Sequence, residues 1–187
     1  QQVIQAVPEA MSLALPSTQF EGILQKFNAI GIGCGLGTRV MEKKLLQALL
    51  TLQLGPLLID ADGLNLLAED KKLLQILPIN TVLTPHPGEF DRLFGKHSTT
   101  AERLVTQLEK SKEFNCYIVL KTSITSISTP SGKLYFNTSG NPGMAKAGSG
   151  DVLLGLMTGF AARYPDLETA VCLAVYIHGL AGDCAAG

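Results

Sequence analysis

The stretch NTSGNPGMAKAGSGDVLLG, residues 137–155, decides how the rest of this chain is interpreted. It begins as a glycine-rich loop, residues 139–150, and continues into an apolar run that predicts a helix over residues 151–163. Glycines just before a helix usually permit positive φ angles or a close approach of the backbone to a ligand. The stretch therefore predicts a binding loop at a helix N-terminus.

The residue types at the end of this loop indicate which ligand it binds. Gly148, Ser149 and Gly150 can expose consecutive backbone N–H groups at the helix N-terminus, an arrangement that attracts phosphate. Asp151 is either the N-cap of the helix or a base that takes a proton from a substrate hydroxyl, and the long glycine-rich approach favours the base. The loop is not a Walker A motif, because no Gly-Lys-Ser/Thr follows the glycines.

Outward from this loop, short apolar segments alternate with longer segments of helical periodicity. This alternation predicts an α/β fold, with a mostly parallel sheet covered by helices on both faces. One antiparallel hairpin is expected near an edge of the sheet. We expect strands at residues 28–33, 56–60, 81–84 and 117–121, hairpin strands at 125–128 and 133–136, and helices at 39–54, 89–94, 99–114, 151–163 and 167–185.

The bulk composition excludes several classes of protein. The 187 residues, 46% hydrophobic, predict one domain with a sizeable core. A net charge of −1 indicates no nucleic-acid partner, and no apolar run approaches the roughly 20 residues that span a bilayer, so no membrane partner is expected. The four cysteines form no CxxC pair, which favours reduced thiols and a cytoplasmic location. They are Cys34, Cys116, Cys172 and Cys184.

Polar motifs follow several of the expected strands. They are GIGCGLGT at residues 31–38, DADGLN at 60–65, TPHPGEF at 84–90 and KTSIT at 121–125. In open α/β sheets, ligands bind outside the carboxyl ends of the strands. These motifs and the loop before Asp151 are therefore expected to meet in one site.

Three of these motifs carry a resemblance. The stretch 137–155, LIDADGLN at 58–65 and LTPHPGEFDRLFG at 83–95 are similar, in this order, to signatures of the ADP/ATP-dependent NAD(P)H-hydrate dehydratases. The resemblance covers residues 28–187 and implies the three-layer ribokinase-like fold. Enzymes of this family are carbon–oxygen lyases that use ADP or ATP, with Mg²⁺, to dehydrate the S-form of hydrated NADH or NADPH (NADHX, NADPHX).

The resemblance also implies roles for single residues. Asp151 would contact the substrate and deprotonate its hydroxyl, and Gly35 and His86 would bind the substrate. Gly150 would bind the nucleotide, and the N–H groups of residues 148–150 would stabilise the transferring phosphoryl group. The family's adenine-nucleotide segment is usually K-G-x-x-T, and here Thr122 replaces its glycine. The matching residues are Lys121, Thr122, Ser123, Ile124 and Thr125.

Some residues keep two interpretations. Asp60 and Asp62, with Asn65, could bind Mg²⁺ through water or cap a helix that begins near residue 64. Glu89 could organise metal-bound water or cap the helix that it begins. His97 is expected at the surface, and His178 is expected as a core histidine on an apolar helix.

The resemblance also predicts what this chain lacks. Members usually begin with a strand, a glycine-rich segment and an alanine-rich helix, and they continue after the segment HGLAGD at residues 178–183. We therefore expect residues 1–187 to form one domain that is incomplete at both ends. Two alternatives are a vitamin or sugar kinase of the same superfamily and a catalytically silent nucleotide-binding module. A homo-oligomer and an association with an NAD(P)HX epimerase are the expected protein partners.

Overall fold

A computed structural model describes residues 20–52 and 54–187 of the chain, and it contains one six-stranded sheet. The strands lie side by side in sequence order, from β1 to β6. The first four are parallel, and β5 and β6 continue the sheet as an antiparallel hairpin at its edge. This arrangement confirms the predicted α/β class and the hairpin. The strands are β1 (Ile30–Ile32), β2 (Leu57–Ile59), β3 (Thr81–Leu83), β4 (Tyr117–Leu120), β5 (Ser126–Ser128) and β6 (Leu134–Phe136).

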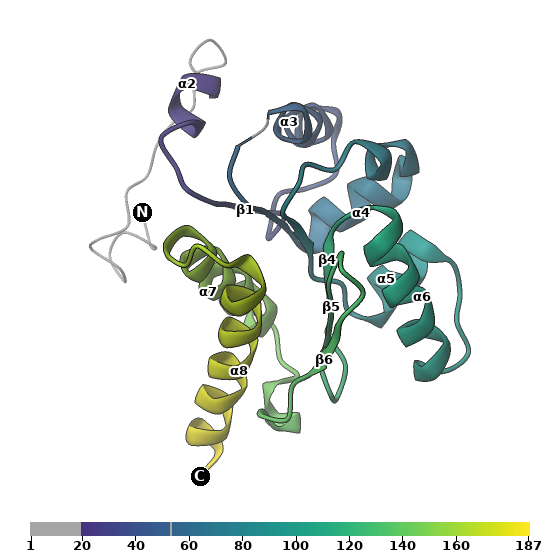
Figure 1. Cartoon of the computed structure of the whole chain (residues 1–187), viewed down its shortest axis with the longest axis vertical. Coiled ribbons are helices and arrows are strands. Elements are labelled where there is room, and N and C mark those ends of the chain that lie inside the picture. The colour runs from purple at the N-terminus through teal and green to yellow at the C-terminus, as the bar shows by residue number, and fades with distance from the viewer. Residues whose placement is uncertain (1–19, 53) are drawn as a thin grey trace.

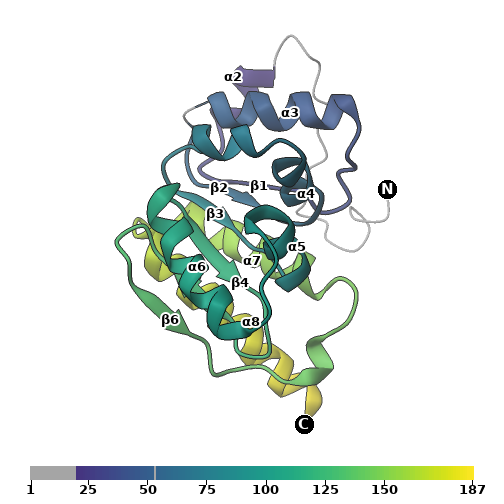
Figure 2. The same ribbon diagram turned by 90° about the vertical axis from the view of Figure 1, so that its right-hand side faces the viewer.

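Helices cover both faces of the sheet, which makes three layers (Figure 1, Figure 2). One face carries α3 to α6 and the other carries α7 and α8. The helices are α2 (Phe20–Leu24), α3 (Val40–Thr51), α4 (Ala61–Glu69), α5 (Pro87–Phe94), α6 (Thr100–Glu113), α7 (Ser149–Arg163) and α8 (Leu167–Ala186), with 3-10 turns η1 (Lys71–Ile76) and η2 (Pro142–Met144). Residues 1–19, part of the stretch that the sequence left unassigned, lie outside the described residues.

Two hydrophobic cores lie on the two faces of the sheet, because successive strand residues point in opposite directions. In β2, Ile59 packs into the core under α3 to α6, and Leu58 packs into the core under α7 and α8. Phe90 of α5 fills the first core and Met157 of α7 fills the second, both fully buried. The consecutive apolar residues in the strands are therefore explained by burial on both faces.

The hairpin strand β5 is buried although it carries two serines, and Gln107 of α6 explains how. The Gln107 amide donates to the carbonyls of Ile118 (2.8 Å) and Ser126 (3.2 Å). Its Oε1 accepts from Ser126 Oγ at 2.7 Å, and the Ser128 hydroxyl donates to the Gln107 carbonyl. A buried polar group that lacks a hydrogen-bond partner destabilises the fold, and these groups all have partners.

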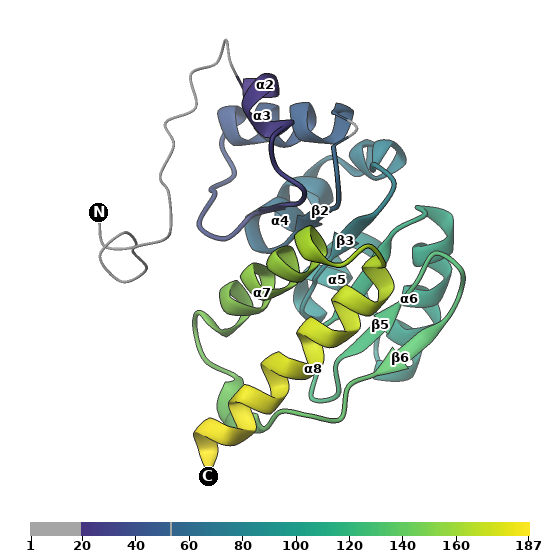
Figure 3. The same cartoon turned by 60° about the vertical axis from the view of Figure 1, so that its left-hand side comes forward.

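Helix α8 differs from the expectation that no segment could span a bilayer. It has 20 residues, a mean hydropathy of 1.4 and few charges, so its length and composition are those of a membrane span. The same composition is found in helices that pack into a protein interior. In this structure α8 packs on α7 (Figure 3) and contributes Ala170, Val171, Ala174 and Val175 to the core.

Candidate functional site

A pocket of about 810 Å³ lies where β3 and β4 end and α7 begins. Seven of the predicted site residues line it: His86, Lys121, Thr122, Ser123, Thr125, Ser149 and Gly150. Gly35, Ile124, Gly148 and Asp151 do not line it. The structure therefore brings the KTSIT segment, the TPHPGEF motif and the glycine-rich loop together, as the positions of the strand ends predicted.

The glycine-rich loop ends in a left-handed turn. Helix α7 begins at Ser149, two residues before the expected start, and its N-cap is Gly148 with φ +89°. A side chain is rarely tolerated at such a φ, so glycine suits this position. Asp151 lies in the first turn of α7, after the N-cap, so it does not cap the helix. Its side chain is exposed.

The amide groups of this turn are only partly used by the protein. The Ser149 N–H donates to the Lys146 carbonyl at 3.3 Å. Among the described residues, the N–H groups of Gly148 and Gly150 have no acceptor. Two of the three predicted anion-binding amides are thus available at the positive end of the α7 dipole.

An ion pair lies beside this turn. Lys121, one residue after β4, places its Nζ 2.7 Å from Oδ1 of Asp60, one residue after β2. Their side chains are 20% and 3% exposed. A methyl group at Gly150 would lie 3.5 Å from Lys121 Nζ and 3.7 Å from Asp60 Oδ2, so the backbone of Gly150 passes directly over the pair. Lys121 therefore lies, paired with Asp60, beside the turn that the sequence predicts as an anion hole.

The acidic candidates for magnesium are engaged in contacts within the protein. Asp60 is the N-cap of α4 and accepts from the Ala61 N–H at 2.8 Å, so this helix begins three residues earlier than expected. Asp62 accepts from the Gly37 N–H at 2.8 Å and so ties α4 to the GIGCGLGT turn. No three His, Cys, Asp or Glu residues of the described chain form a group that could hold a metal ion. The magnesium role of these carboxylates stays a prediction.

His86 and Glu89 form a capping box at the start of α5. His86 Nδ1 accepts from the N–H groups of Gly88 (3.0 Å) and Glu89 (3.4 Å), and Glu89 Oε2 accepts from the His86 N–H at 2.8 Å. Helix α5 thus begins at Pro87, and Glu89 has the capping role that the sequence left open. Because Nδ1 accepts, the neutral His86 ring carries its proton on Nε2, and the half-exposed ring lines the pocket.

Asp151 lies near the GIGCGLGT turn, because it acts on the thiol of Cys34, the neighbour of Gly35. Burial and then Asp151 raise the pKa of the Cys34 thiol to about 12, so the thiol keeps its proton. Gly35 has φ +63°, and nothing lies near its Cα on the side where a Cβ would project. The GIGCGLGT turn and the KTSIT segment therefore both lie near the start of α7.

The sequence did not predict that α8 takes part in the pocket. His178 is half-buried in the pocket wall and not in the core, with Nε2 3.5 Å from Ser149 Oγ. Burial lowers the pKa of His178, and the backbone of Ser149 opposes this shift. Asn137, Ser139, Asn141 and Met144 also line the pocket. The two glycines in HGLAGD could have indicated this, because a glycine inside a helix often marks a place where another segment of the chain packs closely against the helix.

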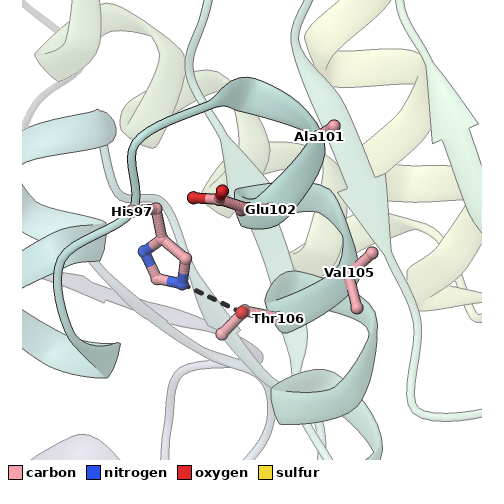
Figure 4. A pocket seen from close by; sticks show the side chains of 5 residues that line it. All are labelled: His97, Ala101, Glu102, Val105 and Thr106. Atoms are coloured by element: carbon pink, nitrogen blue, oxygen red, sulfur yellow. Dashed lines mark hydrogen bonds between the residues drawn. The ribbon is translucent and has the colours of Figure 1, made fainter.

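A second, shallow pocket of about 510 Å³ lies over α6 and holds none of the predicted site residues (Figure 4). His97, expected at the surface, is only 10% exposed there. Its Nδ1 lies 3.0 Å from Asp91 Oδ1 and its Nε2 lies 2.9 Å from Thr106 Oγ1. Arg103 binds the same Asp91 carboxylate with two N–H groups. This network joins α5 to α6 and serves their packing.

Comparison with known proteins agrees with this geometry. All residues from 1 to 187 match the family described as NAD(P)H-hydrate dehydratase. The chain is 39% identical, over 98% of its length, to the bifunctional NAD(P)H-hydrate repair enzyme of Thermofilum pendens. It is 36% identical, over 97% of its length, to the ADP-dependent (S)-NAD(P)H-hydrate dehydratase of Neisseria meningitidis. It spans 36% of the first relative and 62% of the second.

Solved structures show the same fold. A ribokinase-like superfamily protein from Enterococcus faecalis superposes with a TM-score of 0.86 at 31% identity, covering 99% of this chain and 65% of that one. The ADP/ATP-dependent NAD(P)H-hydrate dehydratase of Bacillus subtilis, crystallised with ATP and Mg²⁺, gives 0.77 at 28% identity, covering 95% and 64%. The fold, the ordered motifs and these matches lead to one conclusion: the chain belongs to the NAD(P)H-hydrate dehydratase family of ribokinase-like proteins.

Proposed function

We propose that this chain carries the nucleotide and catalytic sites of an ADP/ATP-dependent dehydratase that acts on (S)-NADHX and (S)-NADPHX. The observation that carries the proposal is the position of Gly150 at the start of α7. Gly150 lines the main pocket and lies beside Lys121, and the next residue, Asp151, lies near Cys34 and the GIGCGLGT turn. A phosphoryl donor in the pocket and a hydroxyl acceptor beside Gly35 would then meet at the start of α7.

In this proposal the nucleotide occupies the main pocket. Thr122, Ser123 and Thr125 supply polar groups along its wall, and Gly148 and Gly150 supply free amides at the phosphoryl end. Amides already aimed at developing negative charge stabilise a transition state because they need no reorganisation. The ammonium of Lys121, held in place by Asp60, would donate to phosphate oxygens at the same place.

Asp151 is proposed as the base that takes the proton of the substrate hydroxyl. It stands in the first turn of α7 next to the proposed phosphoryl position, and its exposure leaves room for a substrate. Transfer of a phosphoryl group to the hydroxyl oxygen converts a poor leaving group into a good one. Loss of phosphate together with a ring proton then restores the dihydropyridine ring.

Magnesium is proposed to enter with the nucleotide. The described residues offer no cage for it, because Asp60, Asp62 and Glu89 are already engaged in hydrogen bonds. Magnesium usually keeps several waters and is held by substrate phosphates with one or two carboxylates. The bound ion would neutralise phosphate charge, and the Bacillus subtilis relative crystallised with ATP and Mg²⁺ supports its presence.

A second activity is proposed to act beside this one. The Thermofilum pendens relative is named a bifunctional repair enzyme, and the chain matches only about a third of it. We propose that an NAD(P)HX epimerase is the partner, because it would convert the R-form of the hydrate into the S-form that this site takes.

The test is recovery of NADH absorbance from prepared (S)-NADHX with Mg²⁺ and either ADP or ATP. We expect recovery that requires nucleotide and is lost in Asp151→Asn. Asp166→Asn is the matched control, because Asp166 caps the distant start of α8 and asparagine keeps the cap. Nucleotide binding without recovery by the folded chain would favour a silent binding module. A stable phosphorylated product from a vitamin or sugar would favour a kinase.

A further inference from the structure

The C-terminal part of α8 makes close contacts with the loop that forms one wall of the main pocket. Residues 139–144 of this loop, which we call the pocket turn, include the 3-10 turn η2. They lie against α8 near its C-terminal end (Figure 3). Asn141, Pro142 and Met144 of the pocket turn line the pocket, together with His178 and Gly179 of α8.

Asp183 makes the polar part of this contact. Its Oδ2 accepts from the Gly140 N–H at 2.8 Å, and its Oδ1 accepts from Asn141 Nδ2 at 3.1 Å. The same Asn141 amide donates to the Gly182 carbonyl at 2.8 Å, and its Oδ1 accepts from the Gly143 N–H at 3.0 Å. The carboxylate therefore holds two consecutive residues of the pocket turn. Asn141 in turn binds Gly143, so η2 is also held in place.

Two glycines of α8 make the contact possible. A methyl group at Gly182 would overlap Met144 Sδ, and one at Gly179 would overlap Ser139. Gly140 has φ +99°, which lets the chain turn over this notch. Ser139 Oγ donates to the Tyr176 carbonyl at 2.8 Å and closes the other end of the contact. Glycines inside a helix weaken it, so their place here is explained by the close approach of the pocket turn.

The pKa of Asp183 agrees with this contact. It is lowered, first by the Gly140 N–H and then by Asn141, because these hydrogen bonds favour the charged carboxylate.

We propose that Asp183 is a positioning residue that holds the pocket turn against α8 and so keeps one wall of the nucleotide pocket in its binding conformation. The role in nucleotide use rests on the proposed function. The ordering of the turn does not, and it can be measured without any turnover.

Lys146 offers a direct readout of this ordering. It is exposed, it follows the pocket turn by two residues, and trypsin cleaves after lysine. In Asp183→Asn an amide nitrogen replaces one carboxylate oxygen, so one of the two donors loses its acceptor. We expect trypsin to cleave after Lys146 about tenfold faster in this variant, with the cleavage site identified by mass spectrometry. We expect the KM for ATP to rise by a similar factor, with a smaller change in kcat.

Two further variants make the test specific. Glu168→Gln removes another carboxylate of α8, one that pairs with Lys133 and Tyr135 away from the pocket turn, and it should leave cleavage after Lys146 unchanged. Exchange of the two partners, Asn141→Asp combined with Asp183→Asn, keeps one amide and one carboxylate at the contact, but it loses the donor to the Gly182 carbonyl. This exchange should restore part of the protease resistance and of the KM, which a general loss of stability would not allow.

The outcomes separate this inference from the proposed function. Faster cleavage in Asp183→Asn, rescued by the exchange, supports the inference even where no variant dehydrates NADHX. In that case protection of Lys146 by added ATP replaces the KM as the measure of nucleotide binding. Cleavage and ATP protection equal to those of the parent chain would overturn the inference, and so would a defect shared by Glu168→Gln.

Discussion

Lys121 and Asp60 lie 61 positions apart in the sequence, and their side chains meet 2.7 Å apart beside Gly150. The contact joins the end of β4 to the end of β2, so it spans three strands of the sheet. It gives Asp60 two functions, because the same Oδ1 also caps α4. The pair lies beside Gly150 at the start of α7, where the sequence predicts an anion hole.

The first prediction concerns this ion pair. Lys121→Met leaves Asp60 nearly fully buried without its cation, and breaking such a pair costs about 3 kcal/mol of unfolding free energy. The measurement is the urea midpoint at neutral pH. Asp70→Asn, which breaks the more exposed Lys43–Asp70 pair, is the control and should cost less than about 1 kcal/mol. Equal losses of unfolding free energy in the two variants would contradict the prediction that burial makes the Lys121–Asp60 pair more important for stability.

The second prediction concerns Gln107. Gln107→Leu removes the donor for the Ile118 and Ser126 carbonyls and the acceptor for the Ser126 hydroxyl, all of them buried. Groups left unsatisfied in this way cost about 1–3 kcal/mol each, so we expect a loss of at least about 2 kcal/mol in denaturant unfolding. Gln107→Glu at low pH, where the side chain can be protonated, keeps part of the network and should recover part of the loss.

The third prediction concerns pH. Arg103 and then His97 lower the pKa of Asp91, so its folded pKa lies below its unfolded value. The stability from this contact is therefore fully present above the unfolded pKa of about 4 and is lost as the pH falls through the folded pKa. Urea midpoints measured from about pH 6 to about pH 2 should fall more steeply in the parent chain than in Asp91→Asn. Parallel curves would contradict the assignment.

The fourth prediction concerns thiol reactivity. The thiols of Cys34 and Cys116 have pKa values raised to about 12, chiefly by burial, so both stay protonated near neutral pH. Because the thiolate is the reactive form, iodoacetamide should label the exposed Cys184 well before either of them. In Asp151→Asn, Cys34 loses a neighbouring negative charge and should be labelled faster. Mass spectrometry of tryptic peptides measures both effects.

The sequence predicted most elements, because they depend on local signals. Apolar runs located the four parallel strands. The helix expected at residues 99–114 is α6, and of its two cap candidates, Thr99 and Thr100, the structure shows Thr99 in a capping box with Glu102. The starts of α4, α5 and α7 were placed two or three residues late. The caps of these helices are Asp60, His86 and Gly148. Asp60 was among the predicted caps, although its helix was expected later, whereas His86 and Gly148 were not predicted as caps because apolar periodicity does not mark the cap.

By itself, the sequence determined the α/β class, the order of the elements and the meeting of the polar motifs at one end of the sheet. Periodicity and turn chemistry are local properties, and the rule that links strand ends to ligand sites is general. Only the tertiary structure decided that Lys121 pairs with Asp60, that His178 lines the pocket, and that Asp183 holds residues 140 and 141. These contacts depend on how strands are aligned and how α8 lies on the loop, and distances between remote residues are set by packing.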